Sequence, residues 1–229
     1  MKTHIAPHEE ILSSLSGRLI DEMKDMERVN LLVCTGPDEI ALLEKMSALC
    51  IQRQISLENV SVLCACEFSG LEKSDERSCF SRVKKALAGS GITDITDPSE
   101  HEDYDAYIAS AGGIDIAIVG IGFNGAVAFN EPGVQYGSYT HLQKLTVKTA
   151  ALYAEVFGDR ESVPEYGMTA GIKTLVSARN IRVIALGESR AAPVYLMLYA
   201  RDDSVVPAAF LQLPMNVDVY LDKEAASRL

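Results

Sequence analysis

The sequence of 229 residues has no tryptophan and only six phenylalanines, and it has fewer basic than acidic residues. Lys and Arg number 21 against 32 Asp and Glu, which gives a formal net charge of −11. A surplus of negative charge repels phosphate backbones at long range and argues against nucleic acid as the main partner. No apolar run approaches the length of a membrane span, so we expect no membrane association.

We expect neither an export signal nor a disulfide framework. The first ten residues, MKTHIAPHEE, carry acids where a signal peptide would need its apolar core, so we expect no export and a cytoplasmic location. The five cysteines are odd in number, and Cys34, Cys64 and Cys66 fall in or beside predicted core strands, as reduced cytosolic thiols usually do. Cys64 and Cys66 are predicted to share one strand face, but no histidine lies near them in the sequence. We interpret them as small core residues and expect no metal site.

The apolar content is sufficient for one ample α/β domain. Hydrophobic residues make up 48% of the chain and the mean hydropathy is +0.08, which excludes disorder as a global description. No internal repeat or long linker divides the sequence. We therefore expect residues 1–229 to form a single domain.

The stretch from Ile114 to Gly133, IDIAIVGIGFNGAVAFNEPG, organises the rest of the chain. Its apolar run over 114–119 has the length and composition of a strand buried on both faces, which places it centrally in a parallel sheet. Glycines and a polar loop, Asn130-Glu131-Pro132-Gly133, follow the run. Ligands of open parallel sheets bind at such carboxyl ends of strands, so we expect the functional site here.

Strands and helices alternate along the remaining sequence, which predicts a doubly wound parallel sheet with several loops at one edge. Helices are expected where apolar residues recur at intervals of three and four, and strands where short apolar runs end in turns. The expected helices are 8–26, 78–88, 102–111, 148–157 and 171–179, with one more opened by the turn 35–38 and reaching about 53 and another opened by 187–190 and reaching about 200. The expected strands are 29–34, 60–66, 93–98, 114–119, 141–147 and 181–186, and segments 206–213 and 217–221 close the chain.

The glycines of Gly120–Gly125 match the G-x-G-x-x-G pattern of dinucleotide sites. Such a site requires a continuous helix after the third glycine and an acid about 20 residues further on. The loop at 130–133 interrupts that helix, and Leu145–Val147 offers no acid. A nucleotide-binding oxidoreductase is therefore the least favoured of the functions considered.

These residues resemble the signature of the glucosamine-6-phosphate deaminase and galactosamine-6-phosphate isomerase family. The resemblance extends over nearly the whole chain and implies a Rossmann-like fold, a sugar phosphate as ligand and no metal or redox cofactor. The family reaction opens the ring of an amino-sugar 6-phosphate, moves a proton between C2 and C1 and, in the deaminases, releases ammonia. The matching stretches are Gly120–Gly122, Gly125, Ala128–Gly133, Glu67–Leu71, Met168–Gly171 and Leu186–Arg190, and Pro207–Leu211 looks closer to the galactosamine branch.

When the family's motifs are aligned with this sequence, most of the positions of its proton-transfer residues hold other residue types. The base Asp falls at Cys66, next to Glu67, and the relay His falls at Ala126. The Asp that steers the His falls at Asn124, and Glu131 alone is kept. An alanine cannot carry a proton and an amide is no base near neutral pH, so ordinary activity is not expected. The remaining catalytic candidates are Glu131, Glu67 and Cys66.

The phosphate side is altered as well. The family's glycine-threonine turn reads Thr35-Gly36-Pro37-Asp38 here, in which Pro37 lacks an N–H donor and Asp38 adds a negative charge. Arg190 stands where the family has a phosphate-binding Lys and could pair with phosphate bidentately. The predicted substrate-binding residues are Thr35, Gly36, Gly122, Asn124, Gly125, Asn130 and Arg190.

Three functions follow as hypotheses. The chain is a family enzyme that works on a related sugar with Glu67 and Glu131, a non-catalytic descendant that binds a sugar phosphate or a protein, or an oxidoreductase. Structural interpretations compete with each assignment: Glu131 braces its loop, Asp38 favours a helix dipole, Cys66 fills the core and Arg190 is a surface cation. The sequence leaves a homo-oligomer open.

Overall fold

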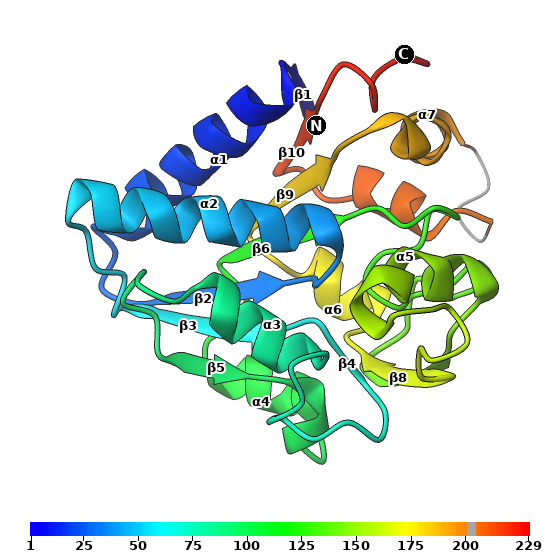
Figure 1. Cartoon of the computed structure of the whole chain (residues 1–229), viewed down its shortest axis with the longest axis horizontal. Coiled ribbons are helices and arrows are strands. Elements are labelled where there is room, and N and C mark those ends of the chain that lie inside the picture. The colour runs from blue at the N-terminus through cyan, green and yellow to red at the C-terminus, as the bar shows by residue number, and fades with distance from the viewer. Residues whose placement is uncertain (201–204) are drawn as a thin grey trace.

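Seven parallel strands form the central sheet, in the order β1-β10-β9-β6-β2-β3-β5 (Figure 1). The structure is a computed structural model, and it describes residues 1–200 and 205–229. Short apolar runs bounded by turns form these strands, as expected of strands with helices on both faces. The strands are β1 (Lys2–Ile5), β2 (Val29–Val33), β3 (Val60–Cys64), β5 (Asp94–Thr96), β6 (Ile116–Gly120), β9 (Asn180–Ala185) and β10 (Val217–Leu221).

Strand β6 lies in the middle of this order and is buried along its whole length. Ile116 and Ile118 belong to the apolar cluster on one face of the sheet, whereas Ala117 and Val119 belong to the cluster on the other face. Alternate side chains of a strand point to opposite faces, so β6 contributes to both cores. The prediction of a central buried strand at 114–119 is confirmed.

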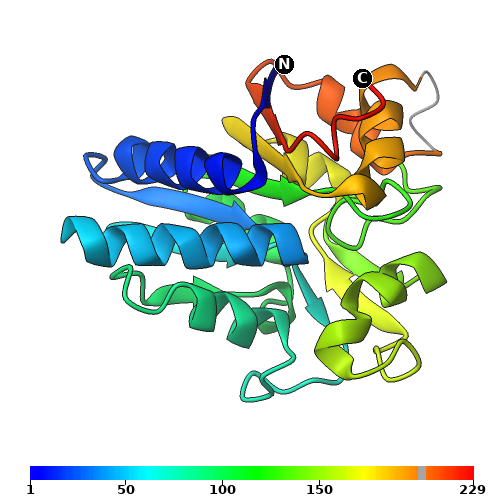
Figure 2. The ribbon, with the colours of Figure 1, turned by 45° about the horizontal axis from the view of Figure 1, so that its top comes forward.

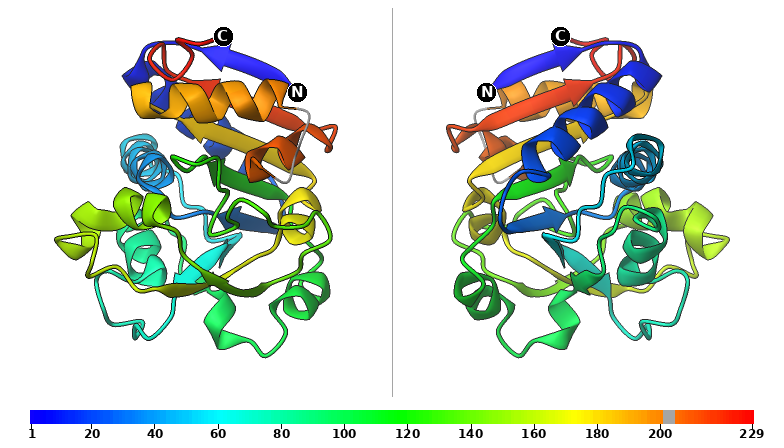
Figure 3. Two further views of the ribbon diagram at one scale, coloured as in Figure 1. Left: turned by 90° about the vertical axis from the view of Figure 1, so that its right-hand side faces the viewer. Right: turned by 90° about the vertical axis from the view of Figure 1, so that its left-hand side faces the viewer.

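Helices cover both faces of the sheet, which confirms the predicted doubly wound α/β architecture. Helices α1 (His8–Met23), α2 (Pro37–Arg53) and α3 (Cys79–Ala86) pack on one face. The opposite face is covered by α4, α6, α7 and a short 3-10 helix, η3, and Figures 2 and 3 show the sheet between the two layers. The bounds of these elements are Tyr104–Ser110 for α4, Ile172–Val176 for α6, Ala191–Tyr199 for α7 and Pro207–Gln212 for η3; two further 3-10 turns are η1 (Pro98–Glu100) and η2 (Glu188–Arg190).

A second, antiparallel sheet of three strands lies beside the carboxyl edge of the large sheet (Figure 1). It has the order β4-β8-β7, with β4 at Cys66–Phe68, β8 at Tyr166–Thr169 and β7 at His141–Lys144. Helix α5 (Val147–Phe157) packs against it through an aromatic cluster of Phe68, Phe129, Tyr153 and Phe157. This small sheet and α5 form one wall above the strand ends.

The single strand predicted over 60–66 is wrong. Strand β3 ends at Cys64 and β4 begins at Cys66 in the other sheet. Between them, the Ala65 N–H donates to the Val33 carbonyl and the Ala65 carbonyl accepts from the Ala170 N–H, so the chain passes from one sheet to the other at this residue. Consequently Cys64 and Cys66 lie in different apolar clusters and do not share a strand face.

Other boundaries shift for local reasons. The strand predicted over 141–147 ends at Lys144, because the Thr146 hydroxyl accepts from the Thr149 N–H and caps α5. The helix predicted over 8–26 ends at Met23. Strands β1 and β8 were not predicted; β1 is a mostly exposed edge strand without an alternating apolar pattern. Among the described residues, no helix is long and apolar enough to cross a membrane.

Candidate functional site

The carboxyl ends of β2, β6 and β9 meet above the sheet, at the edge where the sequence predicts the site. A cavity of only about 20 Å³ lies between them. A pocket for a small-molecule ligand usually has about 300–1,000 Å³, and about 10–15 Å³ is enough for one water. The crevice is thus nearly filled by its own residues, which are Cys34, Gly36, Glu39, Gly120, Ile121, Gly122, Ala126, Ala128, Thr149, Leu152, Tyr153 and Arg190.

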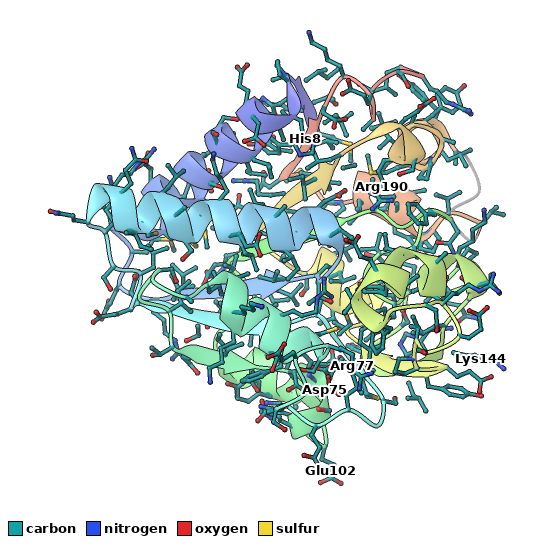
Figure 4. The ribbon with its side chains drawn as sticks, viewed as in Figure 1. His8, Asp75, Arg77, Glu102, Lys144 and Arg190 are labelled. Atoms are coloured by element: carbon teal, nitrogen blue, oxygen red, sulfur yellow. The ribbon has the colours of Figure 1, made fainter. Side chains whose placement is uncertain are left out.

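Glu39, from the first turn of α2, and Arg190, from η2, are the charged residues of the cavity lining, and Asp38 lies beside them against Arg190. The Asp38 Oδ2 atom lies 3.4 Å from Arg190 Nε and accepts from the Leu186 N–H at 3.1 Å. The Glu39 Oε1 atom accepts from the Gly120 N–H at 2.9 Å. All three side chains are buried, and Figure 4 shows Arg190 near the end of α2 that carries the two acids. The Arg190 guanidinium also lies 4.5 Å from the ring centroid of Phe123.

Burial dominates the proton affinity of the two acids. It raises the pKa of the Asp38 carboxyl, although Arg190 and the Leu186 N–H act in the opposite direction. Burial and the neighbouring Asp38 charge raise the pKa of Glu39 to about 7. Sequence reasoning did not select Glu39, because nothing in its local pattern distinguishes it from an ordinary acid in the first turn of a helix. Glu39 is nevertheless the titratable carboxyl that lines the cavity.

Cys66 and Thr35 lie together in a buried thiol cluster beside the cavity. The Thr35 hydroxyl donates to Cys79 Sγ at 3.0 Å and lies 3.3 Å from Cys66 Sγ. Burial raises the pKa of the Cys66 thiol above its ordinary value. The thiol therefore stays protonated near neutral pH, where it is a weak base and a weak nucleophile.

The Glu67 carboxylate holds the start of α3. Its Oε1 accepts from the N–H groups of Phe68 and Cys79, at 2.7 and 2.9 Å, and its Oε2 accepts from the Phe80 N–H at 2.9 Å. Burial raises the pKa of the Glu67 carboxyl, and the three N–H groups oppose that rise. These three partners are all backbone donors, so the geometry gives Glu67 a bracing role.

We expect Glu67→Gln to lower the free energy of unfolding by about 2 kcal/mol, because an amide group replaces the oxygen that accepts from Phe80. Chemical denaturation of the variant measures this loss. The matched control is Glu72→Gln, in the exposed loop before α3. A Glu67→Gln variant as stable as the control would contradict the bracing role.

Glu131 braces the loop after β6. Its Oε1 accepts from the Thr146 N–H at 2.8 Å, and its Oε2 accepts from Asn124 Nδ2 at 2.7 Å and from the Thr146 hydroxyl at 3.1 Å. The Asn124 Oδ1 in turn accepts from the Ala126 N–H at 3.1 Å. Glu131 lines a neighbouring open hollow with Tyr139 and His141, and it does not line the small cavity.

Asn130 and Gly125 fix the same loop to other elements. Asn130 Nδ2 donates to the carbonyls of Val127 and Ala170, at 2.9 and 2.8 Å. Gly125 has a φ of +80°, and a Cβ there would lie 2.6 Å from the Val206 side chain. Of the predicted substrate-binding residues, Gly36, Gly122 and Arg190 line the cavity, whereas Thr35, Asn124, Gly125 and Asn130 do not. Their roles in binding and catalysis stay predictions.

Comparisons with known proteins agree on one family, although no family model matches the chain. The chain is 34% identical to a glucosamine-6-phosphate deaminase of Halalkalibacterium halodurans, over 71% of each chain. It is 30% identical to a glucosamine-6-phosphate deaminase of Marinomonas sp., over 93% of this chain and 86% of that protein.

Solved structures lead to the same fold. A structure described as a monomeric glucosamine-6-phosphate deaminase superposes with a TM-score of 0.94 at 27% identity, over 100% of both chains. A 6-phosphogluconolactonase from Shewanella baltica shares the fold, with a TM-score of 0.72 at 15% identity over 97% of both chains.

Proposed function

The chain belongs to the glucosamine-6-phosphate deaminase family of amino-sugar phosphate metabolism, and from this premise we propose that it is a non-catalytic member. It neither deaminates nor isomerises amino-sugar 6-phosphates, and it acts in the cytoplasm by binding a partner. The cavity of about 20 Å³ at the strand ends carries this proposal, because it has no room for a hexosamine phosphate.

The chemistry of the cavity lining supports the proposal. The family reaction requires a carboxylate base over C1 and C2 and a histidine that moves the proton of the ring oxygen. The lining instead has the methyl group of Ala126 and the thiol of Cys34, whose pKa burial raises well above its ordinary value. The carboxyl of the lining is Glu39; burial raises its pKa to about 7, and its Oε1 already accepts from the Gly120 N–H.

Catalysis on a related amino-sugar phosphate, of either the glucosamine or the galactosamine series, is the second candidate. Likeness over the full length to a structure described as a monomeric glucosamine-6-phosphate deaminase favours it. This candidate would need Glu67 or Glu131 to leave its hydrogen-bond partners and reach the sugar. The hydrogen bonds that each of these acids accepts argue against such a movement.

We expect the purified protein to release no ammonia and form no ketose from glucosamine-6-phosphate or galactosamine-6-phosphate. The deaminase of Halalkalibacterium halodurans, assayed in parallel, is the positive control. Turnover of either substrate above about 1 per second would overturn the proposal, since that is the ordinary range of enzymes. A ligand that prefers the folded state must raise the thermal midpoint. We expect neither sugar phosphate to bind, so neither should raise it.

A further inference from the structure

Several donors converge at the first turn of α2. The N-terminus of this helix of 17 residues directs backbone N–H groups and a partial positive charge toward the cavity. Gly120, whose N–H donates to Glu39, and Arg190 line this cavity, and the Leu186 N–H donates to Asp38, which lies against Arg190. Such a combination is the usual construction of a site for an oxyanion.

The chain's own carboxylates take the positions of the anion. Asp38 lies against Arg190 and the Leu186 N–H, and Glu39 lies on the Gly120 N–H. A Cβ atom at Gly36 or Gly120 would collide with the Glu39 carboxylate, which therefore lies directly on bare backbone at both glycines. When both carboxylates are ionised, they outnumber the single guanidinium and give this place a net negative charge, which repels any further anion.

The chain's own carboxylates do not pair with every donor at the first turn of α2. Arg190 is 4% exposed, and its buried Nε, 3.4 Å from the Asp38 Oδ2 atom, has no hydrogen-bond partner among the residues that the structure describes. A buried guanidinium N–H without an acceptor is costly, and an oxyanion that binds bidentately would supply one. This unpartnered donor is independent of the helix terminus and also points to an anion.

We propose that Asp38 and Glu39 block an oxyanion site from within, and that removing the two carboxylates opens it to a phosphate group. The inference rests on the proposed function, because an enzyme that turns over sugar phosphates would keep this site open. Asp38 and Glu39 are then the residues that exclude phosphate from the crevice. The ligand class of the opened site is a phosphate or a phosphate monoester.

The test is inorganic phosphate binding to the double variant D38N/E39A, measured by titration calorimetry and by the shift of the thermal midpoint. D38N removes a charge at nearly constant shape, and E39A removes a charge and makes room. The control is E10Q/E44Q, which removes two exposed acids from α1 and α2. We expect the double variant to bind phosphate at least about tenfold more tightly than the wild type and the control. Adding R190M to the double variant should abolish the gain.

Each outcome is decisive. A folded D38N/E39A variant without gain, or a wild type that binds phosphate equally well, overturns the inference and leaves the proposed function intact. A gain that survives R190M overturns the assignment of the site to Arg190. If D38N/E39A does not fold, the single variant E39A is read in the same way. Turnover of amino-sugar phosphates by the wild type would overturn the proposed function and this inference together.

Discussion

Arg190→Met should lower the free energy of unfolding by about 3–5 kcal/mol at pH 8, the cost of leaving a buried charge without its partner. The Arg190 guanidinium is the cation that lies within ion-pair distance of Asp38 in the described part of the chain, and both side chains are buried. Methionine retains most of the apolar volume of the arginine stem, so the loss reports mainly the charge. Chemical denaturation at a fixed pH measures it.

The same variant should recover part of this loss as the pH falls. In the wild type, the Arg190 charge lowers the pKa of Asp38 against the effect of burial. Without Arg190 that pKa rises further, so the carboxyl takes up a proton at a higher pH than in the wild type. Arg160→Met is the matched control, because Arg160 forms an exposed ion pair with Glu161 and should cost less than about 1 kcal/mol. An Arg190→Met variant that loses no more than this control would contradict the buried ion pair.

The central part of the fold could be predicted because its signals are local. The run over 114–119 is apolar and bounded by glycines, which specifies a buried strand. The alternation of such runs with amphipathic helices specifies the doubly wound sheet. The edge strand β1 escaped prediction because it lies on the exposed rim, where a strand needs no apolar pattern.

The site could be predicted only in outline. The edge of the sheet, the glycine turns and Arg190 followed from the sequence, and Arg190 lines the cavity. The filling of the crevice by Glu39 did not follow, because it depends on the Gly120 N–H, which lies 81 residues further along the chain. Likewise the backbone donors to Glu67, and the Thr146 and Asn124 groups that donate to Glu131, come near these acids only in the folded chain. Sequence patterns identify acids, but the choice between a bracing and a reacting acid depends on these long-range contacts.

Glu39 should make the protein less stable as the pH rises from about 5 to about 7.5. Its pKa is about 7 in the folded chain against an ordinary value of 4.5, so between these values the folded state binds more protons than the unfolded state. The free energy of unfolding therefore falls as the pH rises through this window. The stabilising effect is complete below about pH 4.5 and is lost above the folded pKa. A shift of this size corresponds to about 3 kcal/mol.

Denaturation curves of the wild type and Glu39→Gln across this pH range measure the effect. The glutamine Oε1 can still accept from the Gly120 N–H, but the side chain does not titrate, so the variant should lose most of the slope and exceed the wild type in stability above pH 7. Burial raises the pKa of Asp38 and Glu67 as well, and they contribute a slope of the same sign to both proteins, so the difference between the two curves reports Glu39 together with its coupling to Asp38. Glu44→Gln, on the exposed side of α2, should keep the wild-type slope. Parallel curves for the wild type and Glu39→Gln would mean that burial does not raise the pKa of Glu39. The Glu39 carboxylate would then not lie in the buried position on the Gly120 N–H from which it is proposed to block the oxyanion site.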